Sequence, residues 1–478
     1  MQQARPSLLS RAAPGRSFRR ASGLVGVAVL GFAVALTGPP SAQEAASPQR
    51  DVPKLEAKSA PAQEFGALFD AVVATTARSF WDKQRLAGIG WEKRAAVVRP
   101  SVVEAANLEE AASRINALLG EIKSSHTGLL TPDDVDYYVL LAVFGGASMP
   151  QEEFDDRFWG AGVTFAGIGI FSARIDGRDF VDVVLEGSPA ARAGLKVGDE
   201  IVSVDGAAYH PIRSFRGKVG NSAAVAIRRA QDAPTETLQI PVMSIAPLHA
   251  FREATRASAR VIERDGRRIG YVHVWASVGE ESSNALQDSL VKLGVREWSR
   301  DDKNESSRPA PLDGLIIDMR GKIGGTGGTA TRYLEVLDPR GPLMGSRDKS
   351  KRSRATRALR GRTAVLIDQH TRSTAELFVH AYKRERQGPL IGTRTAGAVS
   401  AASAFAMPGG NLLYLAVSGL EIDGEVLEGP GVAPDIEVAR PIPYSGGADP
   451  VLEAGVQALV AKAKGRGGVA PDGKAAGP

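Results

Sequence analysis

Few side chains of this 478-residue chain suit nucleophilic chemistry. It has no cysteine, no His-Glu-x-x-His pair and only six histidines. The histidines are His126, His210, His249, His273, His370 and His380. Covalent catalysis would therefore use a serine, threonine, lysine or carboxylate. No two histidines have the spacing of metal ligands, so we expect neither a metal nor another cofactor.

Ser373 occupies a position where a hydroxyl can act as a nucleophile. The buried strand Ala364–Ile367 precedes it after a short turn, and a helix from about Thr374 to Arg386 follows. A strand–turn–helix junction exposes the hydroxyl and points unpaired helix N–H groups at a reacting carbonyl. The same position also suits a serine that only caps the helix.

Candidate partners of Ser373 each have a structural alternative. His126 follows an amphipathic helix, where it could act as a base or interact with the helix end. Glu428 could orient a base or be a solvated hairpin carboxylate, and His370 is a rival base three residues before Ser373. The glycines of 321–328 are not followed by Gly-Lys-Ser/Thr, which argues against a phosphate loop.

Composition indicates a folded chain of two or three domains. The apolar share is 43% and the net charge is +5, which excludes a disordered chain. Five arginines precede Glu44, and without them basic and acidic residues number 54 each. A neutral chain gives no electrostatic reason to expect nucleic acid or an anionic membrane as partner. The lack of cysteine excludes a disulfide scaffold.

The N-terminus reads as a secretory signal. The arginines are followed by an apolar run from Gly23 to Leu36 and then by the small residues of 38–42. This order of segments is typical of export, and the run is short for a membrane span. The alternative is an uncleaved anchor, which would be the chain's contact with a membrane. We expect an exported protein, in a bacterial periplasm.

The pattern of elements changes along the chain. Helical spacing runs from Phe65 to about Leu119, and short strands with glycine turns fill Phe165 to Ile245. After Arg268, strands and helices alternate, apart from a charged insertion at Arg296 to Pro311. This alternation predicts a layered α/β domain. A helix from Pro450 to Lys464 and a Gly/Ala/Pro tail end the chain.

The middle segment resembles a PDZ domain of exported bacterial proteases. The resemblance rests on Gly167-Ile168-Gly169-Ile170 with Gly187-Ser188-Pro189-Ala190, Ala193-Gly194-Leu195 and the run 197–206. Glycines before a strand expose N–H groups that can hold a peptide's terminal carboxylate, while the strand edge pairs with the peptide. The resemblance implies that Gly167, Ile168, Gly169 and Ile170 bind peptides.

Most of the chain, from Phe65 to about Val460, resembles the C-terminal processing (tail-specific) and tricorn-core serine peptidases. The motifs are Val365–Asp368 with Thr371–Glu376, Ile391–Gly397, Gly429–Asp435 and Asp318–Gly325. The motif Asp318–Gly325 differs from the family's Asp-x-Arg-x-Asn-x-Gly-Gly, because Ile323 lies close to the asparagine position. The Ser/Lys members have a lysine directly after the glycine of Thr-x-Gly. Here Ala398 follows Gly397, so that dyad is missing.

The tricorn-core branch uses Ser, His and Glu instead, and the segment Glu121–Thr127 resembles its Ser-His segment. The resemblance implies that Ser373 is the nucleophile, His126 the base and Glu428 the carboxylate that orients the imidazole, assisted by Ser125. It also implies an oxyanion site formed by the N–H of Thr374 with that of Gly324 or Gly325. His126 and Ser373 must then meet in space.

The predicted fold is α/β with α+β modules. It comprises a helical N-terminal region, a PDZ-like β-rich module and a ββα-layer peptidase domain of the Clp/crotonase type. We predict a signal peptide and leader at 1–45, the helical region at 46–160, the PDZ-like module at 161–245, the peptidase domain at 246–445 and a C-terminal helix and tail at 446–478.

The predicted function is an exported serine endopeptidase. Its substrates would be proteins or peptides, and the PDZ-like module would bind apolar C-terminal tails or gate the site. The alternative is a degenerate protease that only binds peptides, as an adaptor. The sequence does not predict an oligomeric state.

Overall fold

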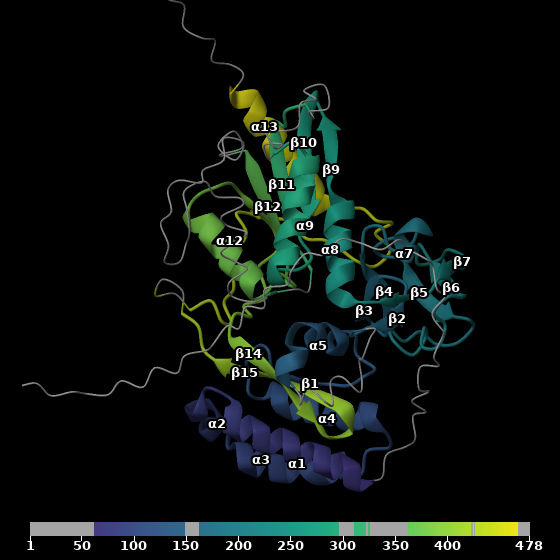
Figure 1. Ribbon diagram of the computed structural model, residues 1–478, viewed down its shortest axis with the longest axis vertical. Coiled ribbons are helices and arrows are strands. Elements are labelled where there is room, and N and C mark those ends of the chain that lie inside the picture. Colours follow the sequence, from purple (N-terminus) through teal and green to yellow (C-terminus); the bar gives the residue numbers. More distant parts are fainter. Residues whose placement is uncertain are drawn as a thin grey trace, which may run out of the picture. The chain divides into compact units, whose positions relative to one another are not determined.

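The structure is a computed structural model that describes residues 62–148, 162–295, 310–321, 324–325, 362–421, 424 and 426–466 (Figure 1). All of them belong to one compact unit, Lys58–Pro478. The predicted leader, nearly all of the linker 46–62, most of the insertion at Arg296 to Pro311 and the tail after residue 466 lie outside these residues. Among the residues described, no helix is both long and apolar enough to cross a bilayer.

Four helices form the N-terminal region. They are α1 (Ala62–Ser79), α2 (Lys83–Ile89), α3 (Trp91–Val103) and α4 (Leu108–Gly120). Asp82 and Asn107 accept hydrogen bonds from amides of the first turns of α2 and α4, as N-cap residues do. Phe65, Phe69 and Ile115 are buried in their shared core. The predicted helical region is present.

The PDZ-like module contains a five-stranded antiparallel sheet. Its strands, in the order β3-β4-β5-β6-β7, are β3 (Ile170–Ile175), β4 (Arg178–Val184), β5 (Glu200–Val204), β6 (Ser222–Arg228) and β7 (Glu236–Pro241). The strands β2 (Phe165–Gly167) and β8 (Met243–Ile245) pair with each other, and the short helix α7 (Pro189–Arg192) follows β4. Within the described residues, β3 has a ladder partner on one edge only.

A six-stranded sheet forms the centre of the predicted peptidase domain. The order is β16 (Ile436–Glu437), β13 (Leu390–Gly392), β12 (Thr363–Ile367), β11 (Gly314–Asp318), β10 (Arg267–His273) and β9 (Arg260–Arg264). All neighbours are parallel except β9, which is antiparallel to β10. A parallel sheet buries both faces, which explains the continuous apolar runs of β11 and β12.

Helices cover both faces of this sheet (Figure 1). The helices α9 (Gly279–Lys292) and α12 (Thr374–Arg384) share a core with Ile317 and Val365. The helix α13 (Pro450–Arg466) shares a second core with Ile316 and Leu366, whose side chains point to the other face. The predicted α/β architecture is therefore confirmed.

Several elements, two helices and two paired strands among them, were not singled out from the sequence, although the first helix falls within the predicted helical region 46–160. They are α5 (Val135–Ser148), α8 (Pro247–Ser258) and the hairpin of β14 (Ala401–Met407) and β15 (Asn411–Ser418). The hairpin takes β1 (Gly128–Leu130) as a third, antiparallel strand, with Gly128 opposite Tyr414. Leu413 and Leu415 of β15 are buried in the core of the N-terminal helices. This sheet joins the helical region to the chain that follows Ser373.

The segment between β16 and α13 runs along the PDZ-like module. The Arg440 guanidinium pairs with the buried Asp182 of β4 at 2.7 Å. Tyr444 donates its hydroxyl to Glu200 at 2.7 Å, and Ser445 donates to the carbonyl of Val197 at 2.9 Å. Through these contacts, residues 438–449 connect the PDZ-like module to the α13 side of the sheet.

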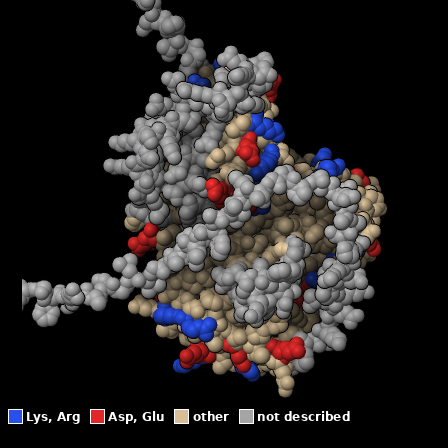
Figure 2. Space-filling view, in the orientation of Figure 1, with Lys and Arg blue, Asp and Glu red and all other residues tan. Residues whose placement is uncertain are grey.

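On the face shown in Figure 2, blue and red side chains are interspersed around a broad area of uncharged residues.

Candidate active site

The candidate residues follow the carboxyl ends of adjacent parallel strands. Ser277 comes after β10, Gly324 and Gly325 after β11, Ser373 after β12, and Ser400 after β13. In a parallel sheet these ends meet along one edge, where α/β proteins hold their ligands. The fold alone therefore brings these segments together.

Ser373 lies on a strained turn at the start of α12. Its φ of 56° and ψ of −125° are unusual for a residue other than glycine, which indicates strain held by the surroundings. Its amide donates to the carbonyl of Ala398 at 2.8 Å. The turn therefore holds Ser373 in a fixed orientation ahead of the first amides of α12.

Glu376, three residues later, organises the opposite side of this turn. Its fully buried carboxylate accepts hydrogen bonds from Thr395 Oγ1 at 2.6 Å and from the amides of Gly397 and Ala398 at 2.7 Å each. Burial raises the pKa of Glu376 although these donors oppose the shift. Sequence reasoning did not select this residue, although Ser-x-x-Glu is the signature of a capping box.

His126 reaches the same edge from the helical region. It lies between α4 and β1 with φ 53° and is 6% exposed. The pairing of β1 with β15 fixes its position, and the Tyr414 ring meets the imidazole edge-on at 5.3 Å between centroids. The helical region thus contacts the chain that follows Ser373, through the pairing of β1 with β15.

Ser125 connects His126 to Glu428. The Nδ1 atom of His126 lies 2.8 Å from Ser125 Oγ, which in turn donates to Glu428 Oε2 at 3.0 Å. A hydroxyl has one hydrogen and a carboxylate can only accept, so Ser125 must accept from Nδ1–H. The other ring nitrogen, Nε2, therefore carries the lone pair.

Four donors converge on the Glu428 carboxylate. Besides the Ser125 hydroxyl, they are the amides of Ser125 at 2.9 Å and of Val399 and Ser400 at 3.0 Å each. Burial alone would raise the pKa of Glu428, but these hydrogen bonds hold it below its ordinary value. The side chain is therefore an ionised carboxylate at neutral pH.

Burial lowers the pKa of His126 to about 4, with a further contribution from the positive charge of Arg372, while Glu428 acts in the opposite direction. The imidazole is thus neutral over the whole physiological range. A neutral ring with its lone pair on Nε2 is the form required of a base.

The Ser373 and His126 side chains are connected through a short stretch of backbone. Ala398 accepts from the Ser373 amide, and the next two amides bind Glu428, the carboxylate linked to His126. Among the described residues no hydrogen bond joins the two side chains directly. Ala398 itself, at the lysine position of Ser/Lys enzymes, is buried and serves through its backbone.

Two of the predicted oxyanion residues, Thr374 and Gly324, lie beside Ser373, and Gly325 follows Gly324. Thr374 is the first residue of α12, where amides lack intrahelical partners. A Cβ added to Gly324 would lie 2.5 Å from Ser373 Cβ and 3.0 Å from Oγ, so its backbone directly adjoins the serine. Gly325 forms a parallel bridge with Ser277, whose amide donates to Gly324 O at 3.3 Å.

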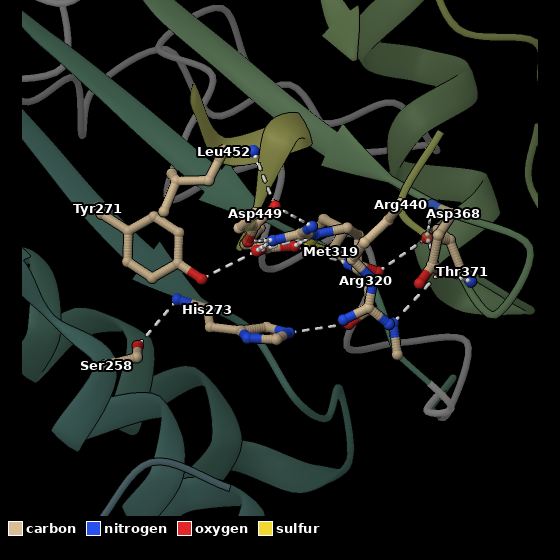
Figure 3. Close-up of polar contacts among 12 residues, drawn as sticks. Ser258, Tyr271, His273, Met319, Arg320, Asp368, Thr371, Arg440, Asp449 and Leu452 are labelled. Atoms are coloured by element: carbon tan, nitrogen blue, oxygen red, sulfur yellow. Dashed lines mark hydrogen bonds and ion pairs between the residues drawn. The ribbon is translucent and has the colours of Figure 1, made fainter. Parts of the chain in front are cut away.

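A buried ionic cluster supports the chain that leads to these glycines (Figure 3). Arg320 binds Asp318 and, through both terminal nitrogens, Asp449, while Tyr271 donates to Asp318 at 2.8 Å. Burial opposes ionisation of Asp318, yet Arg320 and His273 hold its pKa well below its usual range. Separating such a pair would leave a buried charge without a partner, which is costly. The cluster therefore fixes the course of the chain after β11.

The predicted peptide-binding residues lie elsewhere, on the PDZ-like module. Gly169 has φ 87° and accepts from the Leu185 amide, and Ile170 begins the edge strand β3. A small pocket beside them is lined also by Val135 and Val139 of α5 and by Phe251 of α8. Sequence reasoning missed that α5 and α8 face this loop.

His370 points to the PDZ-like module. Its Nε2 lies 3.6 Å from Asp182 Oδ2, the carboxylate that also binds Arg440. Its amide donates to Asp368, which also binds the amide of Thr371. No His, Asp and Glu cluster suited to a metal occurs within the described part of the chain.

Comparisons with known proteins show which families and proteins this chain is similar to. Residues 268–438 match the family model described as "Peptidase family S41", and residues 180–212 match that of the PDZ domain. A curated relative, "Putative tricorn protease homolog 2" of Streptomyces coelicolor, is 26% identical over 419 residues, which are 83% of this chain and 32% of that protein.

The carboxy-terminal processing proteases CtpA and CtpB of Bacillus subtilis are 26% and 25% identical and match 62% and 59% of this chain. This chain spans 62% and 57% of their lengths, less than two thirds of either. Among solved structures, the photosystem II D1 C-terminal processing protease matches 81% of this chain and 98% of its own, at 20% identity and a TM-score of 0.44. Tricorn protease matches 84% of this chain and 37% of its own, at 18% identity and a TM-score of 0.45.

Proposed function

Because this chain carries an S41 peptidase domain with a PDZ domain and is homologous to the tricorn and C-terminal processing proteases, we propose that it is an exported serine endopeptidase with Ser373 as nucleophile. Its substrates are protein or peptide chains. The relay from Glu428 through Ser125 to His126, at the same sheet edge as Ser373, is the observation that carries the proposal.

In the reaction, His126 Nε2 takes the proton of the Ser373 hydroxyl while Oγ bonds to the carbonyl carbon of the scissile peptide. The negative charge moves to the carbonyl oxygen, where the amide of Thr374 and that of Gly324 or Gly325 stabilise it. His126 then gives its proton to the leaving amine as the C–N bond breaks. Water hydrolyses the acyl-serine by the same steps, with the same base.

Ser125 and Glu428 act on the imidazole without touching the substrate. Glu428 holds the Ser125 hydroxyl, which fixes the Nδ1–H tautomer and the plane of the ring. When His126 becomes an imidazolium, the ionised carboxylate compensates its charge through the hydroxyl. They are positioning residues.

The PDZ domain is proposed to bind apolar C-terminal tails at Gly167 to Ile170 or to gate the site. The edge of β3 that has no ladder partner within the described residues supports tail binding. Contacts of α5 with both the PDZ loop and the β14 side of the molecule support gating. The arginine-rich start and apolar run of the sequence support export to a bacterial periplasm.

The test is incubation of the purified protein with an unfolded protein and with peptides that have apolar ends, read by mass spectrometry. Ser373→Ala and His126→Ala should abolish cleavage, and His370→Ala should keep it. Loss in His370→Ala but not in His126→Ala would move the base to His370. Peptide binding without any cleavage by the wild type would favour the adaptor function.

A further inference from the structure

Arg372 directly precedes the proposed nucleophile, in a turn fixed on both sides. Thr371 donates its hydroxyl to the carbonyl of Met319 at 2.9 Å, and the amide of Ser373 donates to Ala398. The backbone of Arg372 therefore has little freedom. Its side chain is half-buried.

The charge of Arg372 has no partner in the described part of the chain. Other interior arginines are paired there: Arg320 with Asp318 and Asp449, and Arg440 with Asp182. Three carboxylates at this turn and beside it, Asp368, Glu376 and Glu428, already accept hydrogen bonds from backbone or hydroxyl donors. A half-buried guanidinium without a counter-ion is costly, so its presence calls for a ligand.

The positive charge of Arg372 acts on the proposed base. That charge lowers the pKa of His126 and opposes the burial that raises the pKa of Tyr414 above its ordinary value. These two rings meet edge-on, and Arg372 directly precedes Ser373, so its charge acts on the base beside the nucleophile. A peptide held by both residues must pass close to it.

This cation disfavours the imidazolium that the reaction needs. An anion bound to Arg372 would remove that penalty at the moment when His126 takes the proton. Carboxylates are the anions that peptides offer, and their two oxygens match the guanidinium fork.

We propose that Arg372 is a specificity residue that binds a carboxylate of the substrate, either an acidic side chain near the scissile bond or the terminal carboxylate of the chain being cleaved. The proposal rests on the function proposed for Ser373. It predicts that substrates carrying such a group are both bound and cleaved better.

The test uses the full chain and four peptides with one sequence and an apolar end. A central residue is Glu or Gln, and the C-terminus is free or amidated. Cleavage gives kcat/KM, and binding is measured on Ser373→Ala. The variants are Arg372→Ala and Arg372→Lys. Arg386→Ala, an exposed arginine beyond the far end of α12, is the matched control, and melting temperatures check folding.

Wild type and Arg386→Ala should prefer a peptide with the carboxylate by about 10- to 100-fold. The preference should vanish in Arg372→Ala and survive partly in Arg372→Lys, which keeps the charge but loses the fork. The Glu/Gln pair and the free/amidated pair tell the two sources apart. A preference for the free end that survives Arg372→Ala belongs to the PDZ loop and contradicts that source.

Equal rates and affinities for all four peptides would overturn the proposal. So would an Arg372→Ala variant that slows all four by one factor, because the side chain would then serve the chemistry or the fold. If the wild type cleaves nothing but Ser373→Ala binds carboxylates through Arg372, the peptidase function fails and the anion site stands.

Discussion

The indole nitrogen of Trp275 donates a 2.7 Å hydrogen bond to the carboxylate of Glu186. Glu186 belongs to the PDZ loop after β4, and Trp275 lies two residues before Ser277, whose amide binds Gly324. The other carboxylate oxygen lies 3.3 Å from Nδ1 of His273, which stacks on the same indole. One side chain thus fixes the PDZ loop to the segment beside the proposed oxyanion site.

Replacing Glu186 tests this connection. Glu186→Leu removes the acceptor of a buried N–H and should lower the free energy of unfolding by about 1–3 kcal/mol. Glu186→Gln keeps an acceptor for Trp275 and should cost less. Equal losses in both variants, measured by urea unfolding, would show that the hydrogen bond is not the cause.

The Glu186→Gln variant should also change how the free energy of unfolding depends on pH. Burial would lower the pKa of His273, but Asp318 and Glu186 raise it above its ordinary value. Such a group contributes stability below its unfolded pKa of about 6.5, and this contribution is lost as pH rises through the higher folded value. Glu186→Gln should flatten that decline in unfolding experiments between pH 6 and 8. An unchanged slope would exclude Glu186 as its source.

Ser125→Ala should disconnect His126 from Glu428 and lower kcat on the order of 10²-fold, with a smaller effect on KM. Ser124→Ala is the control, because that hydroxyl donates only a 3.3 Å bond to the Ser125 carbonyl. Steady-state kinetics on one cleavable peptide would decide. Equal rates for both variants would exclude the relay.

The rate should depend on pH through His126. Because burial lowers its pKa to about 4, kcat/KM should rise with a midpoint near pH 4 and stay level through neutrality. The free energy of unfolding should also fall as pH drops from about 6.5 to 4, because in that range His126 binds a proton in the unfolded chain but not in the folded one. A midpoint near 6.5 in the pH–rate profile would mean that the imidazole is solvated.

Gly324→Ala should abolish activity through crowding. Its Cβ would meet that of Ser373 at 2.5 Å, and a shift of about 1 Å in either backbone costs on the order of 10²-fold in rate. Gly120→Ala, at the end of α4, has nothing within 4 Å of the new carbon and should keep full activity. Peptide cleavage by the two variants, with melting temperatures alongside, checks this. Full activity of Gly324→Ala would place the oxyanion donors elsewhere.

The sequence predicts those parts of the fold that have a local pattern. The apolar run of β12 and the helix after Ser373 both follow from residue periodicity. Helix α5 does not, because Val135, Val139 and Leu141 place apolar side chains on several faces, which pack on different neighbours. A helix that is apolar all round presents no single stripe to detect.

The site, too, could be predicted from the sequence only in part. Ser373 is marked by its place between strand and helix, whereas the partners of Glu376 are backbone amides about 20 residues later, which leave no mark in the sequence. Ser125 and Glu428 are 303 positions apart, so only the resemblance to a family suggested them together. No sequence pattern marks Arg372. Its proposed role is inferred from its unpaired charge, beside carboxylates that already accept hydrogen bonds from other donors.

The distance along the chain between Ser125 and Glu428 bears on how the protein matures. A ribosome makes the imidazole segment hundreds of residues before its carboxylate, and β1 has no partner strand until β15 emerges. Nascent chains that end before Glu428 contain Ser125 and His126 but lack the carboxylate that fixes the tautomer. The proposed site can therefore assemble only after residue 428 has been synthesised and β15 has paired with β1.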